Sequence, residues 1–75
     1  MVEMMVIVYL TLMNGAVVPY KVNDEWPTVT AENGNEGIKK CQAKIDEIVA
    51  EMREDFKDHD PKPSTFMLGC AEKRE

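Results

Sequence analysis

An apolar stretch over residues 4–13, closed by Asn14-Gly15, constrains the fold of this 75-residue chain more than any other feature. The stretch is rich in β-branched and aromatic residues, which predicts a strand over residues 4–13. Asn-Gly suits the two positive φ angles of a two-residue type I′ hairpin, so residues 16–22 are expected to form a second, antiparallel strand. Pro19 cannot donate a hydrogen bond to a ladder, which places the second strand at a sheet edge and the first strand at the centre.

Apolar side chains recur at three- and four-residue steps between residues 36 and 57, which predicts one amphipathic helix. Residues 23–35 mix turn formers with a few strand formers and are expected to form a connecting loop. The prolines at positions 61 and 63 disfavour helical geometry and end the helix. A short third strand is expected over residues 64–71, followed by a charged tail over residues 72–75.

The direction of the chain limits how these elements can be arranged. If the helix returns along one face of the hairpin, the last strand runs antiparallel to the first strand and can pair with its free edge. We therefore expect a single α+β domain over residues 1–75, a ββαβ unit in which one long helix covers a three-stranded antiparallel sheet of order 2-1-3. The core of such a small domain supplies only a few kcal/mol of net stability, so dimerisation or a cross-link would be a natural supplement.

Cys41 and Cys70 fall at the same end of this topology, one in the early helix and one near the end of the last strand. Both side chains should point into the layer between helix and sheet. The pair can be a disulfide or redox pair, or it can be two buried thiols in a reducing cytosol, and the second interpretation is favoured. Two cysteines and His59 cannot complete a four-ligand zinc site alone, so neither a metal nor a cofactor is expected.

The sheet face opposite the helix is a candidate self-association surface. A two-residue turn would set Tyr9 opposite Tyr20, and strand alternation then makes both sides of the sheet apolar. One helix can cover only one face, and an exposed apolar face commonly marks an interface. The residues expected to form a homodimer through this face are Ile7, Tyr9, Val18 and Tyr20. The alternative is that Trp26 and the loop over residues 23–35 fold across the sheet and cover it.

Acidic residues crowd the C-terminal half of the predicted helix, where the helix dipole favours cations. The predicted acidic stripe consists of Asp46, Glu47, Glu51, Glu54, Asp55 and Asp58, with only Arg53 and Lys57 in compensation. A violated local preference can signal function, here docking on a basic protein surface or imitation of a nucleic-acid backbone. The alternative is a solvated face that keeps a small protein in solution.

Charge and motifs exclude several classes of function. Fourteen acidic against nine basic residues give a net charge of −5, which repels phosphate backbones and argues against direct nucleic-acid binding. No apolar stretch is long enough to cross a bilayer and no secretory signal is expected, so the cytosol is the expected compartment. His59 has no serine or cysteine near it in the sequence to form a nucleophile pair, so the chain is not expected to be an enzyme.

The order of these features resembles a class of small phage and prophage accessory proteins. The residues that carry the resemblance are 6–12, Asn14-Gly15, 17–20, Cys41 and Cys70. The resemblance implies a host-directed inhibitor similar to anti-CRISPR proteins, several of which are acidic and occlude the basic DNA-binding channel of a Cas effector complex. The implied partner is then a CRISPR-Cas effector in the cytoplasm of a bacterial host, contacted by the acidic stripe. The alternative is a phage structural or assembly accessory protein that self-associates through the exposed sheet face.

Overall fold

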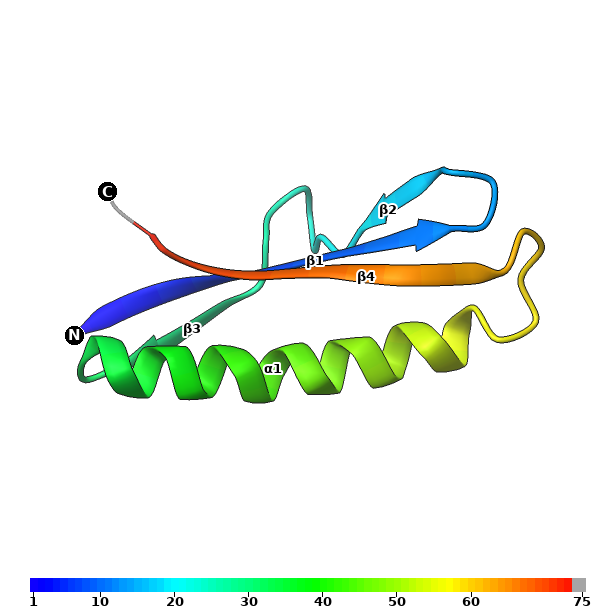
Figure 1. Cartoon of the computed structure of the whole chain (residues 1–75). Helices are drawn as coiled ribbons and strands as arrows, with labels where there is room; N and C mark the ends of the chain where they lie inside the picture. The colour runs from blue at the N-terminus through cyan, green and yellow to red at the C-terminus, as the bar shows by residue number, and fades with distance from the viewer. Residues whose placement is uncertain (74–75) are drawn as a thin grey trace.

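The computed structural model describes residues 1–73 and shows an antiparallel sheet with one long helix lying along one of its faces (Figure 1). The elements in chain order are β1 (Val2–Leu12), β2 (Val17–Pro19), β3 (Thr28–Ala31), α1 (Gly34–Asp55) and β4 (Pro63–Glu72). The expected α+β class, with a long helix on one face of an antiparallel sheet, is confirmed. The helix and the first strand both begin two residues earlier than predicted, and the second strand is shorter.

Strand β1 is the centre of the sheet. It pairs with β4 along one edge, from Met4 to Leu12. Residues 9–11 also pair with β2, and residues 2–5 also pair with β3, so β2 and β3 lie end to end along the other edge of β1. The predicted order 2-1-3 therefore corresponds to β2-β1-β4. The prediction of a loop over residues 23–35 is wrong for residues 28–31, whose Thr-Val-Thr run is β-branched and forms β3.

The predicted two-residue turn at Asn14-Gly15 is also wrong. The hairpin has a three-residue loop, in which the Leu12 N–H donates to the Ala16 carbonyl at 2.8 Å and the Gly15 N–H donates to the Leu12 carbonyl at 3.0 Å. Gly15 takes the positive φ of 88° that this loop needs, while the Asn14 side chain accepts a hydrogen bond from the Ala16 N–H. The extra loop residue shifts the register by one, so Tyr9 lies opposite Pro19 and β2 is turned over.

Two consecutive positive φ angles occur further along the chain, at Asn23 (54°) and Asp24 (64°). The flanking residues Val22 and Glu25 exchange two backbone hydrogen bonds, of 2.8 and 3.0 Å. This pattern is that of a two-residue type I′ turn. The turn belongs to the segment between β2 and β3, which rises on the side of the sheet away from α1 (Figure 1).

The core lies between α1 and the face of β1 formed by its even-numbered residues. The buried residues of the cluster are Val6, Val8, Leu10, Leu12, Cys41, Ile45, Ile48 and Met52. The Asn33 side chain caps the helix by accepting a hydrogen bond from the Glu36 N–H at 2.9 Å. Gly37 lets the helix approach β1 closely, since a Cβ at this position would lie 2.9 Å from the Met4 Cγ.

Candidate functional site

The structure divides the predicted acidic stripe between two sides of α1. At about 100° per residue, Glu47, Glu51, Glu54 and Asp55 follow one side of the helix. These four, with Asp58 in the turn that follows, are named the acidic flank, and all five are exposed. Asp46 lies on the opposite side of the helix, where it lines a groove beside β4. The predicted stripe is therefore wrong for Asp46.

The acidic flank contacts Tyr20, the residue that directly follows β2. The Tyr20 hydroxyl donates a hydrogen bond to the Glu51 Oε2 at 3.2 Å. Burial raises the pKa of Tyr20 above its ordinary value of 10.0, and the neighbouring carboxylates, with Glu51 first, raise it further. Both causes disfavour the phenolate, burial by removing it from water and the carboxylates by repulsion.

Ion pairs compensate the acidic flank only in part. Lys57 Nζ lies 2.7 Å from Glu54 Oε1, and Lys44 Nζ lies 3.7 Å from Glu47 Oε2. Both pairs are exposed and therefore contribute little to stability. Arg53, which the sequence suggested as a compensating charge, lies instead over the Phe66 ring of β4, with its Cζ 5.5 Å from the ring centroid. The flank is thus more negative than the order of charges along the chain suggests.

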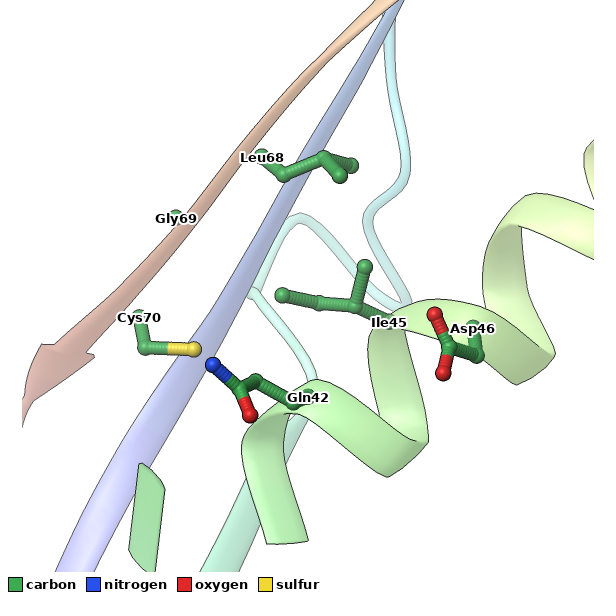
Figure 2. Close-up of a pocket in the computed structure, with 6 residues that line it drawn as sticks. All are labelled: Gln42, Ile45, Asp46, Leu68, Gly69 and Cys70. Carbon is green, nitrogen blue, oxygen red and sulfur yellow. The ribbon is translucent and has the colours of Figure 1, made fainter. Parts of the chain in front are cut away.

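A shallow groove of about 500 Å³ runs between α1 and β4 (Figure 2). Its helix wall consists of Gln42, Ile45 and Asp46, and its strand wall consists of Leu68, Gly69 and Cys70. Figure 2 shows the Leu68 and Ile45 side chains on opposite walls, with the Gln42 amide near the Cys70 sulfur. The groove is open to solvent along β4, because α1 makes more of its contacts with β1 and β3.

The four residues of the predicted self-association face lie on both sides of the sheet. Ile7 and Tyr9 lie on the face away from the helix, whereas Val18 and Tyr20 pack on the helix side against the core. The one-residue register shift causes this split. The alternative expectation, in which Trp26 folds across the sheet, matches the contact seen at Tyr9, where the two rings meet edge-on at 5.1 Å. Lys21 Nζ lies over the Trp26 ring, 4.9 Å from its centroid.

Cys41 and Cys70 are joined in a disulfide that links α1 to β4. The favoured interpretation of two free thiols is therefore wrong for this structure, while the topology did bring the two side chains together. Cys41 is fully buried, so the link runs through the core layer. The disulfide fixes β4 to the helix at one end of the groove.

His59 lies in the turn between α1 and β4, where it contacts two neighbouring residues. Its Nδ1 lies 2.7 Å from the Pro61 carbonyl oxygen, and its ring packs against Phe56 at 4.9 Å between centroids. Among residues 1–73 no group of three or more histidine, cysteine or acidic side chains is placed to hold a metal ion. Within the same described part of the chain, α1 is not apolar enough to span a bilayer.

Comparison with protein-family models, with curated proteins and with solved structures finds no match to this chain. The function is therefore inferred from the surfaces of the chain itself, of which the acidic flank carries five exposed carboxylates.

Proposed function

We propose that this chain is a binding protein, and not an enzyme, whose acidic flank docks on the basic surface of a nucleic-acid-binding protein. The observation that carries the proposal is the set of exposed carboxylates on one side of α1 that have few cationic partners. Glu51, Asp55 and Asp58 form no ion pair with any residue between positions 1 and 73. Three of the five carboxylates therefore give up no cation when the flank meets a basic surface, and the exposed pairs of Glu47 and Glu54 contribute little to stability.

The spacing of the carboxylates supports imitation of a nucleic-acid strand. Four of them, Glu47 to Asp55, fall within nine residues of helix, a length of about 12 Å at 1.5 Å per step. This is about one charge per 3 to 4 Å, close to the one phosphate per 3.4 Å of a single DNA strand. A protein channel that binds DNA through spaced lysines and arginines would meet a similar charge density on this helix.

The specific form of the proposal is an inhibitor of a bacterial defence complex, encoded by a phage and acting in the cytoplasm of the host. It follows from the resemblance of the sequence to small phage proteins of the anti-CRISPR kind. The basic partner is then the DNA-binding channel of a Cas effector complex, and bound inhibitor would block DNA binding. The acidic flank and the Cys41–Cys70 disulfide lie toward opposite ends of α1, so the flank is not built on the disulfide itself.

Displacement of labelled duplex DNA from purified type I and type II effector complexes tests this proposal. The wild-type chain should displace DNA, with a potency that falls as salt rises, since the contact is electrostatic. A variant with Glu47, Glu51 and Glu54 changed to Lys should lose this activity. DNA binding that stays unchanged in every effector system would refute the anti-CRISPR form.

A matched variant separates the position of the charges from their number. Glu25, Glu32 and Glu36 are exposed glutamates outside the acidic flank, and their change to Lys gives the same net charge as the flank variant. This control should keep most of the displacement activity. Equal loss in both variants would show that overall charge, and not the acidic flank, drives the effect. Both variants should be compared with and without reductant, because the bacterial cytoplasm is reducing.

A further inference from the structure

The outer edge of β4 carries a long row of backbone groups without partners among the described residues. Lys73 donates its N–H to the Glu3 carbonyl at 2.8 Å, so odd-numbered residues of β4 direct their backbone groups toward β1. The even-numbered residues therefore direct their N–H and C=O groups away from the sheet. Over the regular part of the ladder these outward residues are Phe66, Leu68, Cys70 and Glu72.

The central part of this edge lacks the features that normally protect an edge strand. Proline and charge occur only at the two ends of β4, at Pro63 and Glu72, and residues 64–71 contain neither, although 31% of the whole chain is charged. Met67 and Leu68, at the centre of the strand, are 51% and 54% exposed. The opposite edge of the sheet differs, because it is divided between two short strands and includes Pro19.

We propose that a second copy of this chain binds along β4, forming an antiparallel β4–β4 pair about a two-fold axis at Leu68. In this register Leu68 lies opposite Leu68 of the partner subunit, and Phe66 lies opposite Cys70 of the partner subunit. Phe66, Leu68 and Cys70 of each copy then meet an outward-facing residue of the other copy. The edge is therefore complementary to itself, as an isologous interface requires. This inference does not rest on the function proposed above.

The charge distribution favours a second copy as the occupant of this edge. Two chains of net charge −5 repel one another, and the uncharged segment over residues 64–71 is where that repulsion is weakest. The acidic flank lies on the side of α1 away from β4, since the side facing β4 carries Gln42, Asp46 and Arg53. The paired copies therefore keep their acidic flanks apart and exposed on the outside of the dimer.

In the single chain, β4 already has the extended form that pairing with a second strand requires. The disulfide of Cys70 and the ladder to β1 hold the strand in its extended form, so little ordering is needed on binding. Both helices would lie on the same face of the joined sheet, because a two-fold axis perpendicular to a sheet preserves its faces. Leu68 and Ile45 of each copy would then lie beside the joined strands, and Leu68 would be covered at the centre of the interface.

Sedimentation equilibrium of the full chain over micromolar to millimolar concentrations tests the dimer. The wild-type chain should sediment as a dimer at the upper concentrations, and Leu68→Lys should sediment as a monomer. Val17→Lys is the matched control, because Val17 is 49% exposed on the other edge and the charge change is the same. It should remain dimeric. A monomeric wild type over the whole range, or equal loss in both variants, would overturn the proposal.

Amide hydrogen exchange of the wild-type chain gives a readout that does not depend on a variant that folds. In the dimer the N–H groups of Phe66, Leu68 and Cys70 bond to the partner strand, and in the monomer they face solvent. Their exchange should slow as the concentration rises, whereas the N–H of Met67, which bonds within the sheet, should change little. Exchange at the even-numbered positions that is independent of concentration would refute pairing through this edge.

Discussion

Loss of the Cys41–Cys70 disulfide is expected to remove about half of the stability of this fold. The two cysteines are separated by 29 residues, and for a loop of this length the chain-entropy relation gives about 3.6 kcal/mol at 25 °C. The core of a domain of this size supplies at most about 3 to 5 kcal/mol, so the disulfide contributes about as much as the core itself. Reduction should therefore remove about half of the free energy of unfolding and leave a marginally stable fold.

Urea unfolding followed by the fluorescence of Trp26 measures this loss. Trp26 is the one tryptophan of the chain and packs on Tyr9, so its emission reports the integrity of the sheet. The Cys41→Ala/Cys70→Ala double variant should lose at least as much stability as reduction, because Cys41 is fully buried and its sulfur is also lost from the core. The double variant should not respond to reductant. A fall of less than about 1 kcal/mol on reduction would refute the reasoning.

Three further changes test the cap, the Tyr20 contact and the core, each by urea unfolding. Asn33→Ala removes the acceptor of the Glu36 N–H and should cost about 1 kcal/mol, so an unchanged midpoint would contradict the cap. Because the pKa of Tyr20 is raised in the folded state, the folded chain keeps a proton that the unfolded chain releases above pH 10.0. Stability should be complete below that pH and should fall as the pH rises through the folded-state pKa, and Tyr20→Phe should reduce this fall; an identical pH profile in the variant would exclude Tyr20 as its source. Leu10→Ala empties a site with no solvent exposure and should cost about 2 to 5 kcal/mol, so a loss below 1 kcal/mol would place Leu10 outside the core.

The order of strands was predictable because it follows from a few strong local signals. The apolar run over residues 4–13 required neighbours on both edges, and Pro19 excluded β2 from the centre. The helical period over residues 36–57 then fixed the direction in which the last strand returns. These signals are independent of the tertiary packing, which is why they can be used without a structure.

The face of β2 was not predictable, because it depends on one residue in the hairpin loop. Asn14-Gly15 is compatible both with a two-residue type I′ turn and with a three-residue loop that places only Gly15 at positive φ. The two choices differ by one residue in register and exchange the faces of Val18 and Tyr20. For this reason the four residues of the predicted self-association face lie on both sides of the sheet.

The acidic stripe was only partly predictable from the sequence. The positions of Asp46 and Arg53 could have been assigned from helical geometry, because both fall on the other side of α1 from Glu47 and Glu51. The contact of Arg53 with Phe66 depends on where β4 lies and could not be read from the sequence. Strand β3 was missed because four residues in a turn-rich segment give too short a signal.

The disulfide bears directly on the proposal that the chain acts in a bacterial cytoplasm. Disulfides persist in oxidising compartments, whereas cytosolic thiols are kept reduced. If the chain acts in a bacterial cytoplasm, its reduced form must keep the acidic flank folded under those conditions. A bound partner would stabilise that form by mass action, since it binds only the folded chain.

Hydrogen exchange of the chain in the presence of a Cas effector complex tests the central claim most directly, because it locates the contact surface. The account predicts slower exchange over residues 47–58 and at Tyr20, with the odd-numbered amides of β4 unchanged. The same regions should lose this protection when Glu47, Glu51 and Glu54 are changed to Lys. Protection that falls elsewhere and leaves residues 47–58 unchanged would contradict the account.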